Sequence, residues 1–427
     1  MLRRNMMPYS LILLTAALSF SSYAYGQISV LTYGAKCDWN GSIGTDDTTA
    51  FQNAAKAASA LYTANKGLAI AISSVQLPAG QACVVNGAVP IGSGVHFVGP
   101  GTIVVQNQVG PTLQFQNADN VGVENLRVYI EAGPPGNLAA LAVLSWTDTS
   151  SDTLAHANVD FTGNTIVDGS WGIYVTSASG TGSLQNVNIS NNNVMSSSPY
   201  THADGIHVNG NVHGITIGQN RVTMRGDAAI ALTSGPGASR TLTGAVVSGN
   251  TCLEDVTGLD NSGASEAVWS NNFVRATNSI TNQSNPAARS IVYVGLTPYN
   301  VKFIGNHLEN YQGTGTDVTA KVDDTSSPSV TNVDWIGNTI VGTNAMWLNG
   351  NTMALHDNVF SPGATVLVEY DAGDNYPGEN IMIGRNYWLG NGTVSAPGNP
   401  GLYVNNSIAN QQSNGTFTLV GPFRSTP

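Results

Sequence analysis

One eight-residue pattern recurs nine times in the sequence, and it strongly limits the folds that the chain can adopt. Each copy has apolar residues at positions 1, 3 and 8 and an asparagine at position 6, as in Val159–Ile166 (VDFTGNTI) and Val301–Leu308 (VKFIGNHL). The asparagines span 222 residues in eight intervals of 20 to 34, a mean of about 28. They are Asn164, Asn192, Asn220, Asn250, Asn272, Asn306, Asn338, Asn358 and Asn386. Val121–Val128 (VGVENLRV) matches an earlier copy, with Leu126 at the asparagine position.

The repeat predicts stacked strands. Alternating apolar residues in the first half of each copy indicate a strand with one buried face. Unequal intervals fit a solenoid whose corner loops vary in length while its strands stay in register. We therefore predict an all-β fold, a single right-handed parallel β-helix. Its asparagine amides should hydrogen-bond from coil to coil, and each asparagine should turn the chain in a left-handed conformation. A propeller fits less well, because its repeats run about 40 residues or longer.

A second strand follows the asparagine in several coils. Segments 171–175 (WGIYV), 204–208 (DGIHV) and 228–232 (AAIAL) align on their isoleucines. If those isoleucines point inward, Tyr174, His207 and Ala231 share an outward row. We expect the next strands of this series at Thr257–Asp260 and Ser279–Thr281.

Residues 1–26 have the features of a secretory signal. Arg3 and Arg4 precede a mostly apolar run from Leu11 to Leu18, and small residues suit cleavage after Ala24 or Gly26. The alternative is an uncleaved membrane anchor. We expect a mature chain that is secreted or periplasmic, with no membrane span.

The mature chain divides into three predicted parts. Residues 27–95 form an N-terminal cap region, 96–395 the coils, and 396–427 a C-terminal tail. Within the cap we predict a first strand at Ile28–Ala35 and a capping helix over residues 44–60. The buried face of that helix consists of Phe51, Ala54, Ala55 and Ala58.

Composition excludes several classes of protein. Only 10% of the 427 residues are charged and 48 are glycine, which argues against coiled coils and charged helical bundles. The net charge of −11 disfavours nucleic acid as a partner, because an acidic surface repels phosphates. In an oxidising compartment Cys37 and Cys83 could cross-link the N-terminal region. Cys252 lies in a patterned segment and is interpreted as a buried free thiol.

The segment Val30–Ala58 (VLTYGAKCDWNGSIGTDDTTAFQNAAKAA) is similar to the N-terminal cap of the pectate-lyase-like β-helix superfamily. Together with the repeats, the resemblance covers roughly residues 28 to 390. That superfamily includes polygalacturonases, other polysaccharide lyases and hydrolases, and phage tailspikes. The resemblance is specific for fold and weak for reaction, because one fold hosts many functions.

Among these relatives, polygalacturonases carry Asn-Thr-Asp, Gly-Asp-Asp, Gly-His-Gly and Arg-Ile-Lys on successive coils. Segment 202–204 (HAD) resembles the first motif, and segment 226–228 (GDA) resembles the second. The resemblance implies that Asp227 is the general acid and that Asp204 is a carboxylate activating water. The alternative is that both aspartates hydrogen-bond a turn at a corner.

The sequence departs from the polygalacturonase motifs at three places. Ala228 replaces the second water-activating aspartate, 256–258 (VTG) stands at Gly-His-Gly, and 279–282 (SITN) replaces the strand with Arg and Lys. These departures put hydrolysis of the polygalacturonase type in doubt.

A uronate lyase needs a base, an acid and a cation beside the substrate carboxylate. His207 could be the base, Tyr174 the acid, and Arg221 or Arg225 the carboxylate clamp. Trp171 aligns with Asp204 and could border the same sugar-binding groove, near His202. The alternative is that Tyr174 and His207 are ordinary exposed strand residues, and His213 is interpreted as a loop residue.

Other polar and aromatic groups have structural interpretations. The loop Asp371–Glu379 (DAGDNYPGE) offers the oxygens of Asp371, Asp374, Asn375 and Glu379 to Ca²⁺, although a solvated corner is the preferred interpretation and no cofactor is expected. Five further tryptophans are interpreted as core or coil-edge packing. They are Trp146, Trp269, Trp335, Trp347 and Trp388.

The leading hypothesis is an exported carbohydrate-active protein that holds an extended polysaccharide along residues 171–260 and cleaves it as a hydrolase or lyase. Its site residues would be Asp204, Asp227 and His207, with Tyr174, Trp171, His202, Arg221 and Arg225 binding substrate. The alternatives are a non-catalytic polysaccharide-binding or surface-attachment β-helix and a trimeric spike. A monomer is preferred over a trimer.

Overall fold

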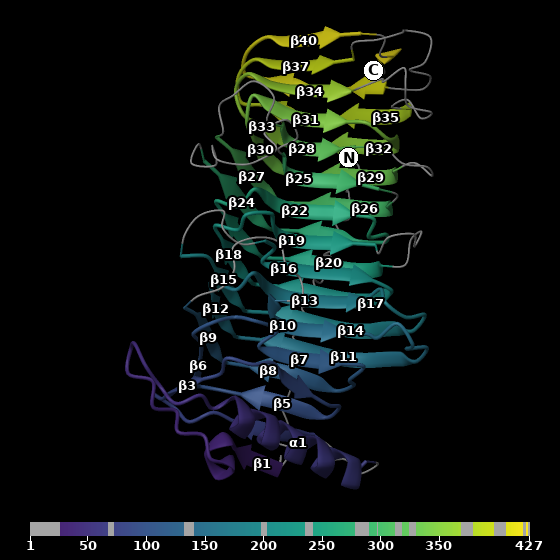
Figure 1. The fold of residues 1–427 in the computed structure, drawn as a ribbon. Helices are drawn as coiled ribbons and strands as arrows, with labels where there is room; N and C mark the ends of the chain where they lie inside the picture. The colour runs from purple at the N-terminus through teal and green to yellow at the C-terminus, as the bar shows by residue number, and fades with distance from the viewer. Residues whose placement is uncertain are drawn as a thin grey trace, which may run out of the picture.

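A computed structural model shows forty-one strands in three parallel sheets of 15, 13 and 13 strands, stacked coil upon coil as a β-helix (Figure 1). It describes residues 26–66, 72–131, 141–197, 203–234, 242–277, 290–296, 298–311, 318–323, 330–368, 379–396, 407–421 and 424–425. The predicted signal and the candidate calcium loop through residue 378 lie outside these ranges. No helix among the described residues is long and apolar enough to cross a membrane.

The first sheet contains the front half of each octet. Its strands are β1 (Gly26–Ser29), β2 (Ser73–Gln76), β5 (Val95–Val98), β8 (Val121–Glu124), β11 (Ala155–Thr162), β14 (Ser183–Ser190), β17 (Val212–Gly218), β20 (Thr243–Ser248), β23 (Val268–Ser270), β26 (Tyr299–Ile304), β29 (Thr331–Ile336), β32 (Asn351–His356), β35 (Glu379–Gly384), β38 (Ser407–Ala409) and β41 (Arg424–Ser425).

The second sheet contains the predicted second strands. It consists of β4 (Val89–Ile91), β7 (Leu113–Gln116), β10 (Ala142–Thr147), β13 (Trp171–Ser177), β16 (Ile206–Gly210), β19 (Ala228–Thr233), β22 (Thr257–Ser262), β25 (Ser290–Gly295), β28 (Val318–Val322), β31 (Asn344–Leu348), β34 (Ala364–Val368), β37 (Gly392–Ser395) and β40 (Phe417–Val420).

The fourth to twelfth strands of the third sheet directly follow the nine ladder asparagines, and all of its strands are short. They are β3 (Ala82–Val84), β6 (Thr102–Val105), β9 (Arg127–Ile130), β12 (Thr165–Val167), β15 (Asn193–Met195), β18 (Arg221–Thr223), β21 (Thr251–Leu253), β24 (Phe273–Ala276), β27 (His307–Asn310), β30 (Thr339–Val341), β33 (Val359–Phe360), β36 (Tyr387–Trp388) and β39 (Gln412–Ser413). The predicted β-helix is confirmed. Strand stacking also continues through both boundaries proposed for the coils, at 95/96 and 395/396.

The nine asparagines form a buried ladder as predicted. From Asn192 onward each Oδ1 accepts hydrogen bonds from the backbone N–H and the Nδ2 of the asparagine one coil earlier, for example 2.9 and 3.0 Å between Asn192 and Asn220. Asn164 Oδ1 accepts the Leu126 N–H instead, at 3.0 Å. The predicted left-handed turn is one residue out of place. The residue before each asparagine has positive φ, such as Gly163 (71°) and Asn191 (58°), whereas the ladder asparagines do not. Turning one residue earlier leaves the asparagine N–H aligned with the next amide.

The N-terminal cap is close to the prediction. Helix α1 spans Thr48–Ala64 rather than 44–60, and the predicted residues of its buried face are buried. Figure 1 shows α1 at the end of the stack beside the first coils. The predicted strand Ile28–Ala35 is wrong beyond Ser29. Val30–Tyr33 forms a 3-10 helix, because Ser29 Oγ accepts from Leu31 N–H and Gly34 ends the turn with φ of 96°.

The interior is a column of aliphatic and aromatic side chains. Trp146, Trp269, Trp335 and Trp388 are all fully buried, which confirms their structural interpretation. Phe303 stacks on Trp335 with ring centroids 4.0 Å apart. Trp347 differs: it lies in the outward row of the second sheet, with Lys321 Nζ 4.3 Å from its ring centroid.

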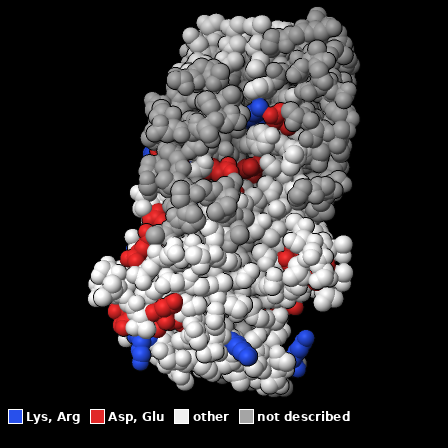
Figure 2. Space-filling view, in the orientation of Figure 1, with Lys and Arg blue, Asp and Glu red and all other residues white. Residues whose placement is uncertain are grey.

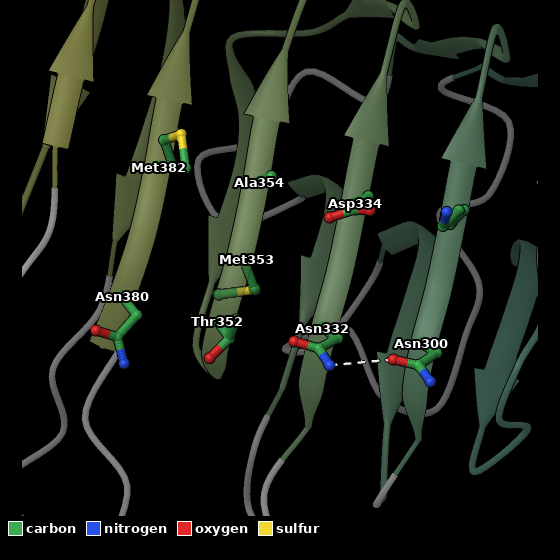
Figure 3. A pocket seen from close by; sticks show the side chains of 9 residues that line it. Asn300, Asn332, Asp334, Thr352, Met353, Ala354, Asn380 and Met382 are labelled. Atoms are coloured by element: carbon green, nitrogen blue, oxygen red, sulfur yellow. Dashed lines mark hydrogen bonds between the residues drawn. The ribbon is translucent and has the colours of Figure 1, made fainter.

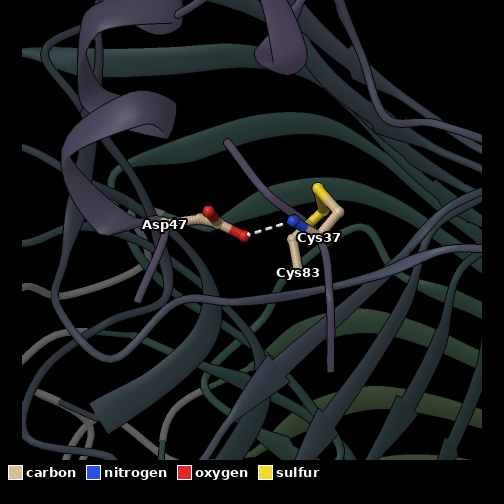
Figure 4. A group of neighbouring side chains, drawn as sticks. All are labelled: Cys37, Asp47 and Cys83. Carbon is tan, nitrogen blue, oxygen red and sulfur yellow. Dashed lines mark hydrogen bonds between the residues drawn. A yellow bond between two sulfur atoms is a disulfide. The ribbon is translucent and has the colours of Figure 1, made fainter. Parts of the chain in front are cut away.

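The predicted cysteine pairing is present. Cys37 and Cys83 form a disulfide with an S–S distance of 2.04 Å, and Cys252 is buried and free. Asp47 beside the disulfide accepts hydrogen bonds from Lys36 N–H and Cys37 N–H at 2.6 and 2.9 Å (Figure 4). Among the described residues, three side chains of types that bind metals lie close together here: Cys37, Asp47 and Cys83. Because both sulfurs are in the disulfide, no thiolate is available there to a metal.

Candidate active site on the second sheet

The predicted outward row on the second sheet is confirmed. Ile173 pairs with Ile206 and Ile206 with Ile230, so Tyr174, His207 and Ala231 are register partners one coil apart. Asp260 on β22 is the next partner, as expected. The strand after it was wrongly placed: β22 pairs with β25, which begins at Ser290, and Ser279–Thr281 lie outside the described residues. The row therefore continues from Asp260 to Tyr293 and Lys321.

His207 is held on four sides. Its Nδ1 lies 2.5 Å from Asp204 Oδ2 and its Nε2 2.7 Å from Thr233 Oγ1. The indole of Trp171 stacks on the ring with centroids 4.6 Å apart, and the edge of Tyr174 approaches at 5.6 Å. With Nδ1 donating to Asp204, a neutral ring accepts the Thr233 hydroxyl proton at Nε2. Both ring nitrogens are thus engaged within the protein.

Asp204 is held as a hydrogen-bond acceptor. Its side chain is 5% exposed, and its Oδ1 accepts the Ala228 N–H at 2.8 Å while Oδ2 binds His207. The structure therefore places a carboxyl group with two hydrogen-bond partners in the corner that leads into β16.

Asp227 lies one coil further along, directly before β19, and is exposed to solvent. Among the described residues no hydrogen bond to its carboxyl group is present. Crowding by surrounding atoms and the charge of Asp204 raise its pKa to about 6, against the attraction of His207.

Asp260 is a third carboxyl group on the same face, and the comparison with the polygalacturonase motifs did not single it out. Burial raises its pKa to about 7, and the negative charges of Asp204 and Asp227 add to that effect. The Ser262 hydroxyl donates to its Oδ1 at 2.6 Å and acts in the opposite direction. Its outward position followed from the predicted register, but its electrostatic link to the other two aspartates did not. Figure 2 shows acidic side chains on this face of the molecule, over the middle of the stack.

Arg225 has a different place from the one predicted. Its side chain is fully buried and donates to the carbonyl oxygens of Gly169, Ser170, Ala203 and Asp204 at 2.8–2.9 Å, and to Ser196 Oγ at 3.2 Å. Burial lowers its pKa to about 10, opposed by nearby aspartates. A guanidinium enclosed in this way ties together the corners before β13 and β16, and does not face a substrate carboxylate.

Three further residues also had a place predicted from the sequence: Arg221, His202 and His213. Arg221 is exposed at the start of β18 in the third sheet, so the structure does not bring it to the carboxyl cluster. His202 lies outside the described residues. His213 was wrongly taken for a loop residue: it lies in β17 and bonds Thr243 Oγ1 and Asn211 Oδ1.

The first sheet carries a separate groove of about 460 Å³ on its outer face (Figure 3). Asn300 and Asn332 form part of its rim, with a hydrogen bond of 3.0 Å between their amides. Lys302 and Asp334 lie inside it. With one carboxyl group in its lining, this groove lacks the paired carboxyls that the second sheet gathers.

Comparisons with known proteins identify the fold. No protein-family model matches the chain, and no curated protein matches its sequence. Many solved structures align with it, and three of them, each at 15% identity, have TM-scores above 0.5. The chain has the fold of a right-handed parallel β-helix.

The three structures belong to proteins of different kinds. The A-module of mannuronan C-5 epimerase AlgE4 from Azotobacter vinelandii aligns over 93% of this chain and 99% of its own, with a TM-score of 0.54. The catalytic unit of a GH87 α-1,3-glucanase from Streptomyces thermodiastaticus aligns over 94% and 69%, with a TM-score of 0.53. An N-terminal fragment of gene product 12 from bacteriophage Phi29 aligns over 92% and 71%, with a TM-score of 0.55. At this identity the likeness establishes the fold alone.

Proposed function

We propose that this protein hydrolyses glycosidic bonds of an extended polysaccharide on the outward face of β13, β16, β19 and β22. The observation that carries the proposal is the carboxyl cluster of Asp204, Asp227 and Asp260, whose members have different surroundings. Asp204 is bound by two hydrogen-bond partners, whereas the pKa values of Asp227 and Asp260 are raised to about 6 and 7. Glycoside hydrolysis needs one carboxyl group that gives a proton and a second that acts as a carboxylate.

The roles follow from the contacts. Asp227 is exposed, its carboxyl group has no hydrogen-bond partner among the described residues, and it is the general acid that protonates the leaving oxygen. Asp204 supplies the negative charge that stabilises the positive charge developing on the sugar and helps to activate water. His207 is a positioning residue that holds Asp204. The half-buried ring of Tyr174 borders the same surface and offers packing to a sugar ring. Trp171 is only 7% exposed and stacks on His207, so it supports that ring from behind.

The likeness to a glucanase and to a mannuronan epimerase also supports a polysaccharide substrate. Export is part of the proposal, and the Cys37–Cys83 disulfide supports it, because such bonds persist in oxidising compartments. We infer a monomer, which sedimentation of the purified chain would test.

A uronate lyase remains the second candidate, because His207 and Tyr174 lie side by side. Two contacts disfavour it: both nitrogens of His207 are engaged, and Arg225 is enclosed by carbonyl oxygens. A non-catalytic polysaccharide-binding or surface-attachment protein is the third candidate, and the departures from the polygalacturonase motifs, such as Ala228, support it.

The test is to incubate the mature protein with a panel of neutral and acidic polysaccharides and follow reducing ends together with the ultraviolet absorbance of unsaturated uronates. We expect reducing ends alone. A parallel rise in absorbance would identify a lyase, and binding without new chain ends would identify a binding protein.

Single substitutions then assign the site. Asp227→Asn and Asp204→Asn should each abolish cleavage while leaving the melting temperature nearly unchanged. The control is Asp334→Asn in the separate groove of the first sheet. Full activity in both site variants would refute the assignment.

A further inference from the structure

The outer face of the first sheet carries another groove near the N-terminal end of the stack, with a volume of about 380 Å³. This N-terminal groove lies on a different sheet from the carboxyl cluster, and it precedes the groove of Figure 3 by several coils. Its volume is within the range of about 300–1,000 Å³ that is typical of small-molecule sites. Most of its lining consists of six polar side chains: His96, Asn120, Asn158, Asp160, Asn186 and Asn188.

One row of the lining is made of amides from three successive coils. Asn186 Nδ2 donates to Asn158 Oδ1 at 3.2 Å, and Asn158 Nδ2 donates to Asn120 Oδ1 at 2.7 Å. Asn120 Nδ2 in turn donates to the Tyr62 hydroxyl of α1 at 3.2 Å. The amide row is therefore anchored to the capping helix. At its other end, Asn186 Oδ1 has no partner among the described residues.

A second row lies two residues further along the strands. Its members are register partners in successive coils: His96, Gly122, Asp160 and Asn188. Asn188 Nδ2 donates to Asp160 Oδ1 at 2.8 Å, and His96 Nδ1 lies 2.7 Å from Glu124 Oε1. A Cβ at position 122 would lie 2.7 Å from His96 Nδ1, so only glycine leaves room for the imidazole there. No side chain therefore stands between His96 and Asp160.

These contacts hold the lining side chains in place and leave part of each polar group unused. Among the described residues no partner is present for Asp160 Oδ2, Asn188 Oδ1 or His96 Nε2. Each amide of the row also has a second N–H that its one hydrogen bond does not use. The groove thus offers both acceptors and donors that are fixed before a ligand arrives, and fixed groups lose less entropy on binding.

The hydroxyl groups of a neutral sugar match this lining, because each hydroxyl both donates and accepts. A uronate does not match it, since the lining contains no lysine or arginine. The hydrogen bond to His96 also lowers the pKa of Glu124, whose negative charge would repel a second carboxylate. An apolar peptide side chain would find little to contact, because Val121 and Val159 are buried and Ile72 is half-buried.

We propose that the N-terminal groove is a binding site for a short stretch of a neutral polysaccharide, separate from the surface on which hydrolysis is proposed. Sugar hydroxyls bind Asp160, Asn186 and Asn188, and Ile72 contacts the C–H groups of a ring. The inference goes beyond the proposed function and does not depend on it, because a chain held here attaches the protein to the polysaccharide with or without cleavage. Where both surfaces bind one polymer, attachment at the groove raises the effective concentration of polymer at the carboxyl cluster.

The test follows histidine ring signals by NMR in the mature full-length protein labelled with ¹³C-histidine. His96 reports on the groove, His207 on the carboxyl cluster and His356 on the distant strand β32. His96→Gln assigns the groove signal as the one that disappears. The probes are maltohexaose, cellohexaose and mannohexaose, with hexagalacturonate as the acidic comparison. Each is added up to about 10 mM, tenfold above a Kd of about 1 mM. For a probe that the wild type cleaves, Asp227→Asn is titrated instead.

We expect at least one neutral probe to shift the His96 signal to saturation, while hexagalacturonate does not and the His356 signal stays in place. Asn186→Ala should raise the Kd by about 2- to 10-fold, and Asp160→Ala by about tenfold or more, because each loses a hydrogen-bond partner of the sugar. The matched control is Asn332→Ala, which removes an exposed amide of the same kind from the groove of Figure 3 and should leave the Kd within about twofold.

Several results would overturn the inference. They are a His96 signal that none of the three neutral probes moves, an equal shift with hexagalacturonate, and an unchanged Kd in both Asn186→Ala and Asp160→Ala. Movement of the His207 signal alone would place the sugar at the carboxyl cluster and also overturn it. Cleavage is measured separately by reducing ends, so a protein that cleaves but does not bind at His96 leaves the proposed hydrolysis intact. A protein that binds at His96 but cleaves nothing leaves the groove intact.

Discussion

Replacing Arg225 by methionine would test whether the site is held together by one buried cation. The guanidinium accounts for hydrogen bonds to four carbonyl oxygens from two neighbouring corners. Two of these carbonyls, those of Ser170 and Asp204, also accept backbone N–H groups from Ala203 and Gly172. The carbonyls of Gly169 and Ala203 have no second backbone donor among the described turn contacts, so methionine leaves them buried and unpaired.

The magnitude follows from those two groups. An unpaired buried polar group costs about 1–3 kcal/mol, so we expect a loss of about 2–6 kcal/mol in the free energy of unfolding. With an unfolding entropy of about 2.1 cal/mol/K per residue, a 4 kcal/mol loss in a chain of this length lowers the melting temperature by about 5 °C. Arg225→Lys should lie between methionine and wild type, because an ammonium reaches fewer of the carbonyls.

Arg221→Met is the matched control for this measurement. Arg221 is exposed in the same stretch of chain, so its replacement should change stability by less than about 0.5 kcal/mol. Urea unfolding followed by circular dichroism gives both values. An Arg225→Met variant as stable as Arg221→Met would refute the argument that Arg225 ties the corners together.

Three other changes should have measurable effects on stability. Asn250→Ala removes four buried hydrogen bonds of the ladder and should cost about 2–4 kcal/mol in urea unfolding, whereas Asn158→Ala in an exposed corner should cost under about 1 kcal/mol. Cys83→Ser removes the disulfide to Cys37, which closes a loop of 46 residues, and should lower the free energy of unfolding by about 4 kcal/mol. A reduced wild type as stable as the oxidised wild type would contradict this. Burial raises the pKa of Asp255 to about 8. This group therefore stabilises the fold below the unfolded pKa of about 4, and that contribution is lost as pH rises through 8. Urea midpoints should fall between pH 5 and 8, and Asp255→Asn should flatten the slope; an unchanged slope would contradict this.

Much of the site was accessible from the sequence because a solenoid brings together residues at matching positions of successive coils. Aligning three isoleucines was enough to place Tyr174, His207 and Ala231 in one outward row, with Asp260 next. The alignment failed at the following coil, where β25 begins only at Ser290. A corner loop of unpredicted length shifts the register of everything after it, and no local pattern marks how long that loop is.

The amino-acid pattern alone determined the stacked coils, the buried asparagine ladder and the capping helix, since each depends on local periodicity. The sequence left open whether Cys37 and Cys83 pair, and the structure shows that they do. Tertiary structure decided the orientation of side chains at irregular corners. Arg225 points inward because carbonyl oxygens from earlier coils surround it, and Asp260 interacts with Asp204 and Asp227 through space across three coils. Electrostatic coupling depends on distance and burial, and neither is encoded in the spacing of residues along the chain.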